Sequence, residues 1–255
     1  MVQINKIIAQ VVTATPQLME ELKSKDKKNR NRRESHINYL QTEIREGRWS
    51  VTNQGIGVSR DGFIVDGGHR IEAIIREGCP PVQFVLVTGL PESAQKYVDI
   101  GAKRSMADIL TLFFNSQINS KIVAVLNVIL KKDSKWQSWK YGPDVYASYF
   151  QEYALAFESI FAVKGIAALP APVVAAFVDE IASGNSVPSR TIDFAQQVTT
   201  GELIQQGDPA YALRNFISNN TGCAAAEIRT KFLKSRAALV AFLENRRISR
   251  LHTIE

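Results

Sequence analysis

Cysteine is scarce in this chain. Two cysteines, Cys79 and Cys223, occur among 255 residues, and they lie far apart in the sequence. Neither has a neighbour at the spacing of a metal-ligand set or of a redox pair, so the sequence indicates two unpaired thiols and excludes a disulfide scaffold. This usage is typical of a protein of the reducing cytoplasm.

Long hydrophobic runs are also missing. The segment from Ala162 to Ile181 comes nearest to a membrane span, but charged residues and prolines interrupt it. Because a transmembrane helix needs about 18 consecutive apolar residues, we expect this segment to be a buried helix and predict no membrane partner. Met1 to Val12 lacks a basic leader followed by an apolar run, so no secretory signal is expected.

The composition is that of a globular protein with a basic surface. Hydrophobic residues make up 45% of the chain and charged residues 22%, which is enough apolar side chain to build one large or two modest domains. The formal net charge is +6. Positive charge favours encounter with anionic partners such as nucleic acid, but it does not specify a fold.

The most informative segment runs from Phe63 to Ile75. A short apolar strand leads through Gly67 and Gly68 into a helix with apolar periodicity. Glycine lets the backbone turn sharply and approach a ligand, and the first amides of a helix attract negative charge. His69 and Arg70 add side-chain donors, and arginine is suited to bidentate phosphate contacts. The pattern therefore predicts a phosphate site.

A structural interpretation of the same turn stays open. Glycine pairs between a strand and a helix are common in α/β proteins, and Asp66 can cap the helix. His69 and Arg70 can be solvated residues of the first turn. Short motifs of this kind match many proteins by chance, so the surrounding sequence has to be considered.

The surrounding residues follow the pattern of a known family from about Thr15 to Ile109. The matching features are Thr15-Pro16, Asn29-Arg30, His36, Gly47-x-Trp49, the strands around Ile56 and Phe63, Asp66-Gly67-Gly68-His69-Arg70, the strand from Val82 to Val87, and Asp99-x-Gly101-x-x-Arg104. With this ordered set the segment resembles the ParB/sulfiredoxin superfamily, in particular its phage- and plasmid-borne members with an Asp-Gly-x-His-Arg signature.

The resemblance implies a small α/β domain whose glycine-rich turn and following arginine hold the phosphate of a nucleotide or a nucleic acid. Members of the superfamily include CTP-dependent DNA clamps, ATP-dependent sulfiredoxins, serine kinases and nucleases. Gly68 stands where sulfiredoxins carry a reactive cysteine, and Gly68-His69-Arg70 stands where ParB clamps carry Glu-Arg-Arg. The resemblance therefore indicates the site better than it indicates the reaction.

The resemblance also assigns further residues to the site. Arg30 or Arg32 is expected to contact phosphate, and the sequence does not distinguish between them. Arg104 would complete a cationic clamp, and Asp99 is expected beside a reacting hydroxyl or as a ligand of Mg²⁺. The candidate catalytic residues are His69, Asp66 and Asp99. A nucleoside triphosphate and Mg²⁺ are the expected cofactors.

Local signals predict the elements around the turn. Helices are expected over Pro16 to Ser24, Ser35 to Glu46 and His69 to Glu77, with glycine after the second and third. Asp61-Gly62 predicts a tight hairpin before the phosphate turn. The predicted fold class is α+β, with a ParB/sulfiredoxin-like α/β domain over residues 1–114 and an all-α domain over residues 115–255.

The last helix of the all-α domain has the strongest positive charge. Its cations and those that follow it are the candidate nucleic-acid contacts: Arg229, Lys231, Lys234, Arg236, Arg246, Arg247 and Arg250. A basic amphipathic helix can lie against phosphates, although a solvated terminal helix has the same pattern. No helix-turn-helix motif is identified.

Three functions follow as expectations. The first is a ParB-like, DNA-associated cytoplasmic protein that binds nucleotide phosphate at Gly67-Gly68-His69-Arg70 and contacts DNA or another protomer, as in a homodimer, through its helical domain. The second is an enzyme that uses the same site, either as a nuclease or as a kinase-like phosphotransferase. The third is an adaptor without nucleotide chemistry.

Overall fold

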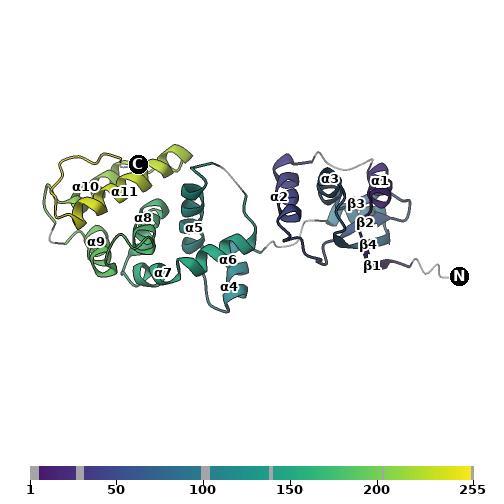
Figure 1. Cartoon of the computed structure of the whole chain (residues 1–255), viewed down its shortest axis with the longest axis horizontal. Coiled ribbons are helices and arrows are strands. Elements are labelled where there is room, and N and C mark those ends of the chain that lie inside the picture. The colour runs from purple at the N-terminus through teal and green to yellow at the C-terminus, as the bar shows by residue number, and fades with distance from the viewer. Residues whose placement is uncertain (1–5, 27–31, 99–103, 138–139, 203, 254–255) are drawn as a thin grey trace. The chain divides into compact units, whose positions relative to one another are not determined.

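The computed structural model describes residues 6–26, 32–98, 104–137, 140–202 and 204–253. The chain divides into two compact units, residues 1–103 and residues 104–255, and each has a hydrophobic core of its own. The first unit combines a four-stranded sheet with helices, and the described part of the second is helical (Figure 1). A small α/β unit followed by a helical unit confirms the expected α+β class.

The sheet of the first unit has the strand order β1-β4-β2-β3. Its strands are β1 (Ile8–Thr13), β2 (Ile56–Ser59), β3 (Ile64–Asp66) and β4 (Gln83–Leu90). β1 pairs with β4 and β2 with β3 in antiparallel fashion, whereas β2 and β4 run parallel. The expected hairpin between β2 and β3 is confirmed, and Gly62 supplies its left-handed residue with a φ of 84°.

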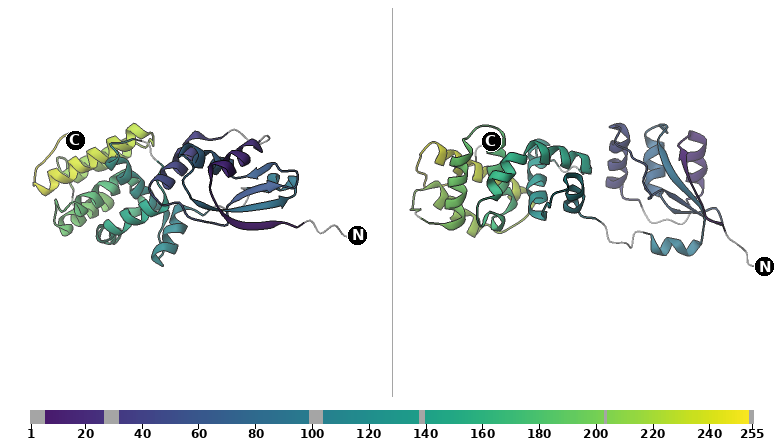
Figure 2. Two further views of the ribbon diagram at one scale, coloured as in Figure 1. Left: turned by 45° about the vertical axis from the view of Figure 1, so that its right-hand side comes forward. Right: turned by 90° about the horizontal axis from the view of Figure 1, so that it is seen from below.

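Three helices cover one face of this sheet, α1 (Pro16–Ser24), α2 (Glu34–Arg45) and α3 (Gly68–Arg76), while the short helix η1 (Glu92–Tyr97) lies on the other side (Figure 2). Thr15 caps α1, because its hydroxyl accepts from the amide of Leu18 at 3.2 Å. The core between helices and sheet is built from apolar residues at helical spacing and from inward strand positions: Met19, Leu22, Ile56, Ile64, Ile71, Ile74, Phe84 and Leu86. The three predicted helices of this unit are confirmed.

The second unit is a bundle around α8 (Ala171–Ala182). Its other helices are α4 (Met106–Phe114), α5 (Ser120–Asp133), α6 (Pro143–Glu152), α7 (Ala154–Phe161), the short η2 (Ile166–Ala168), α9 (Pro188–Thr200), α10 (Pro209–Asn219) and α11 (Ala225–Leu243). α8 packs against α5, α7, α9 and α11, and nine consecutive α8 residues, Pro172 to Glu180, are buried. The buried helix expected in this segment is confirmed.

Two elements were not anticipated from the sequence. β1 forms an additional strand before α1, and α4 is a helix that packs against α5 and α6 and so belongs to the helical unit. The helical unit therefore begins at residue 104, whereas the change in sequence pattern predicted a boundary after residue 114. Every helix in the described ranges is too short or too polar to cross a lipid bilayer.

Candidate phosphate site at the start of helix α3

The turn between β3 and α3 requires glycine. Gly67 has a φ of 97°, in the left-handed region that residues with a side chain rarely adopt. A β-carbon added there would lie 2.8 Å from Cγ1 of Ile56 and 3.0 Å from its Cα, so the backbone of the turn packs directly on β2. Asp66 accepts from the amide of Gly67 at 2.6 Å. Its carboxylate thus holds the turn, while the N-cap position itself belongs to Gly67.

A carboxylate of the chain lies at the first residue of α3. A β-carbon added at Gly68 would lie 3.2 Å from Oδ2 of Asp26 and 3.4 Å from Nε of Arg32. Asp26 pairs with Arg32, and its side chain is only 4% exposed. The helix start, where unpaired amides and the dipole favour negative charge, therefore contacts an acid and a base from the segment after α1.

Arg32 connects this acid to α3. Its Nη1 donates to Oε2 of Glu72 at 2.7 Å, and its side chain is 24% exposed. Glu72 also accepts from Nε of Arg76 at 2.9 Å and lies 3.8 Å from Nζ of Lys23. Burial raises the pKa of Glu72, but the hydrogen bond from Arg76 and the charges of Lys23 and Arg32 outweigh it, so the pKa lies below its ordinary value.

His69 joins α3 to the start of α2. Its Nε2 accepts from the amide of Arg33, the N-cap residue of α2, at 3.0 Å. Its ring also meets the ring of His36 edge-on, with 5.1 Å between the centroids. In this arrangement Nε2 of His69 accepts a hydrogen bond from the backbone at the start of α2. The sequence pattern did not indicate this structural role.

Arg70 points toward the loop that precedes β2. Its Nη1 donates to the carbonyl of Gly55 at 3.2 Å and its Nη2 to Oε1 of Gln54 at 3.4 Å, while Asp66 lies 3.9 Å away. Since Arg32 rather than Arg70 lies against Gly68, Arg32 is the better-placed cation for a ligand at the start of α3.

Three further site residues were predicted, Arg30, Asp99 and Arg104. Arg30 and Asp99 lie outside the described residues. Arg104 belongs to the helical unit, where it is exposed next to the N-cap of α4. The turn thus brings together Asp66, Gly67, Gly68, His69, Arg70 and Arg32.

A Mg²⁺ site is not found in the described part of this region. The described residues contain no group of three or more His, Cys, Asp or Glu side chains that could hold a metal ion. Asp26 and Glu72, which lie beside the turn, both pair with Arg32. Both carboxylates thus already have a cationic partner within the chain.

The cations of α11 are largely engaged within the helical unit. Lys231 is 4% exposed, and its ammonium donates to the carbonyl of Gly222. The prediction that Lys231 lies on an exposed basic face is therefore wrong. Lys234 lies over the ring of Phe216, with Nζ 4.5 Å from the centroid. Arg236 lies 3.5 Å from Glu180. Lys231, Lys234 and Arg236 thus each contact a residue of the helical unit outside α11.

The cations at the ends of α11 are more accessible. Arg229 near its start, and Arg246, Arg247 and Arg250 after its end, are exposed. Arg246 pairs with Glu244, and Nη2 of Arg247 donates to the carbonyl of Gln206 at 2.8 Å. The exposed positive charge thus lies at the two ends of α11, where it does not form a continuous stripe.

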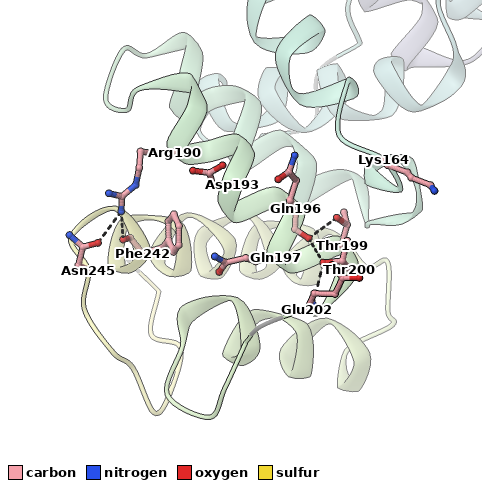
Figure 3. Close-up of a pocket in the computed structure, with 10 residues that line it drawn as sticks. All are labelled: Lys164, Arg190, Asp193, Gln196, Gln197, Thr199, Thr200, Glu202, Phe242 and Asn245. Atoms are coloured by element: carbon pink, nitrogen blue, oxygen red, sulfur yellow. Dashed lines mark hydrogen bonds between the residues drawn. The ribbon is translucent and has the colours of Figure 1, made fainter.

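A separate cavity of about 700 Å³ lies along α9 (Figure 3). At one end Nη2 of Arg190 donates to the carbonyl of Phe242 and to Oδ1 of Asn245, both at 3.0 Å, and its Nε is buried without a hydrogen-bond partner. The rest of the lining is polar and mixed in charge: Lys164, Asp193, Gln196, Gln197, Thr199, Thr200 and Glu202. These residues follow no recognisable motif, which explains why the sequence did not indicate them.

Comparison of the chain with models of protein families, with curated proteins and with solved structures finds no match. The resemblance to the ParB/sulfiredoxin superfamily therefore depends on the motif residues. Chemically, the turn offers helix amides, a left-handed glycine and a neighbouring arginine, which together can bind an anion.

Proposed function

We propose that the first unit is a ParB/sulfiredoxin-like domain that binds the phosphate of a nucleotide at the start of α3, in a protein that associates with DNA. The observation that carries the proposal is the Asp26 carboxylate, which is packed against Gly68 and paired with Arg32. An anionic group of the chain already uses this position. A phosphate would bind the first amides of α3 and the guanidinium of Arg32 after it displaces Asp26.

The lack of a side chain at Gly68 supports this proposal. Since a β-carbon there would be only 3.2 Å from the Asp26 carboxylate, glycine leaves room for an anion close to the backbone at residue 68. Arginine presents a planar pair of donors that matches a phosphate as well as a carboxylate. The net charge of +6 further favours anionic partners, including DNA.

The test is a calorimetric titration with CTP, ATP, GTP and ADP, each with and without Mg²⁺. For the nucleotide that binds, Arg32→Ala should weaken affinity by about tenfold to a hundredfold, the loss typical of a charge-assisted contact. Asp26→Asn should strengthen binding, because it removes the competing carboxylate. Opposite effects from the two partners of one ion pair would be hard to explain by loss of folding.

Matched controls separate these effects from a change of net charge. Arg45→Ala breaks an exposed ion pair with Glu77 between α2 and α3, and Asp61→Asn neutralises an exposed acid of the hairpin. Both controls should leave affinity unchanged. Failure of all four nucleotides to bind, or an Arg32→Ala affinity equal to that of the intact protein, would refute the proposal.

An adaptor without nucleotide chemistry is the second candidate. It is favoured by the internal use of the site, because Arg32 bridges two acids and His69 accepts from the α2 backbone. In that case the same network serves only to hold α1, α2 and α3 together. Variants of Asp26 and Arg32 would then both lower stability, and no nucleotide would bind.

A further inference from the structure

β1 is an edge strand of the described sheet. Among the elements that the structure describes, β1 forms its ladder with β4 alone, in an unbroken register from Ile8 opposite Thr88 to Thr13 opposite Gln83. The next residue, Ala14, donates its amide to the carbonyl of Val82 at 2.8 Å. Since alternate residues of an antiparallel strand point their backbone groups to the same neighbour, the amides and carbonyls of Ile7, Ala9, Val11 and Thr13 point outward.

This edge is apolar and uncharged. Ile7, Ile8 and Val11 are 51%, 47% and 57% exposed. The stretch from Ile7 to Ala14 contains no charged residue and no proline, and the ladder with β4 has no bulge. Proteins ordinarily protect an exposed edge with lysine, proline, a bulge or a covering element. The first three are missing from β1.

We propose that β1 pairs with β1 of a second copy of this chain, antiparallel and about a twofold axis at Gln10. An antiparallel strand is complementary to itself, so one edge supplies both halves of an isologous interface. In this register Ile7 pairs with Thr13 of the second copy and Ala9 with Val11. These are the residues whose backbone groups point outward, and the two sheets join into one.

Charge explains why a second copy would approach through this edge and not through another surface. Each chain carries a formal net charge of +6, so two copies repel one another over most surfaces. The uncharged stretch from Ile7 to Ala14 allows close approach without a like-charge pair. Ile8 then lies opposite Val12 of the second copy, and Val11 opposite Ala9, which covers apolar side chains that are exposed in the single chain.

The test is sedimentation velocity of the full chain over a wide concentration range. Because the contact is confined to one strand of each copy, the dimer should dissociate on dilution. Val11→Lys places two lysines close to the twofold axis and should leave a monomer at concentrations where the unaltered chain is dimeric. Val187→Lys makes the same change at an exposed residue of the helical unit, 66% accessible, and should not alter the dimer. Circular dichroism checks that both variants fold.

Cross-linking tests the register independently of these variants. In a chain whose Cys79 and Cys223 are replaced by serine, Gln10→Cys places two thiols opposite one another at a non-hydrogen-bonded pair, where Cα atoms are about 4.5 Å apart and a disulfide can form. Mild oxidation should give a covalent dimer. Ser50→Cys, an exposed residue outside β1, should stay monomeric. A monomer at all concentrations, or a dimer that survives Val11→Lys and does not cross-link through residue 10, would overturn the proposal.

Discussion

At the scale of single residues, Gly67 has two independent reasons to be glycine. Its φ of 97° disfavours any side chain, and a β-carbon would collide with Ile56. Gly62 in the hairpin has a comparable φ of 84° but nothing within 4 Å of an added β-carbon. Comparing substitutions at Gly62 and Gly67 therefore distinguishes the cost of backbone strain from the cost of a steric collision.

We expect Gly62→Ala to cost about 1–2 kcal/mol of unfolding free energy, the usual penalty of a left-handed residue with a side chain. Gly67→Ala should cost about 1–3 kcal/mol more, since Ile56 or the turn must also move. Urea unfolding followed by circular dichroism measures both. Equal losses for the two variants would mean that the turn relaxes away from β2 without cost.

The residues of the turn could be predicted from the sequence, but their partners could not. Two glycines between a strand pattern and a helix pattern specify a sharp left-handed turn by local geometry alone. Asp26 lies in a basic segment whose sequence is typical of a solvated loop. Its burial against Gly68 depends on how α1 and α3 pack together. Likewise, the bond from the Arg33 amide to His69 joins residues of different helices.

At the scale of elements, α11 shows how charge patterns mislead. The helix packs against α8, α9 and α10, and from Lys231 to its end it has no fully exposed residue. Lys231 and Ser235 are buried among Phe232, Ala238 and Leu239. Periodicity assigns a lysine to the polar face because it cannot recognise an ammonium that donates to a backbone carbonyl of another segment.

β1 was missed for a related physical reason. Its residues are mostly exposed on both faces, so the alternation of buried and exposed side chains that marks a half-buried strand is absent. What defines β1 is its ladder with β4, a pairing between segments that are distant in the sequence.

The ion pairs of Glu72, a residue of α3, predict how the first unit responds to acid. Since the pKa of Glu72 is lowered by folding, its contribution to stability is present above its ordinary value of 4.5 and is lost as the pH falls through the lowered pKa. Glu72→Gln should therefore destabilise the protein at pH 7, by roughly 1–3 kcal/mol, and progressively less below pH 4.5.

Glu34→Gln is the matched control for this experiment. Glu34 pairs with the same Arg76, but its side chain is 62% exposed against 14% for Glu72. Exposed ion pairs contribute little, so this variant should unfold like the intact protein. Unfolding midpoints in urea between pH 3 and pH 7 compare the two. A Glu72→Gln difference that does not shrink toward low pH would contradict the assigned role of its charge.

At the scale of the whole molecule, the two units have separate apolar cores. The first core joins α1, α3 and the sheet through residues such as Met19, Ile71 and Phe84. The second joins the helices of the bundle through Leu126, Phe177 and Phe194. The change in sequence pattern predicts a division into two units. The position of the boundary, at residue 104, depends on the packing of α4 against α5 and α6, which the sequence pattern does not indicate.

We expect each unit to fold without the other. Fragments 1–103 and 104–255 should each show a cooperative urea transition, because each retains its own core. The slope of the transition scales with the surface that unfolding exposes, so it should be larger for the longer helical fragment. The transition of the full chain should then equal the sum of the two fragment transitions. A fragment without a cooperative transition, or a full chain markedly more stable than both, would show that the units stabilise one another.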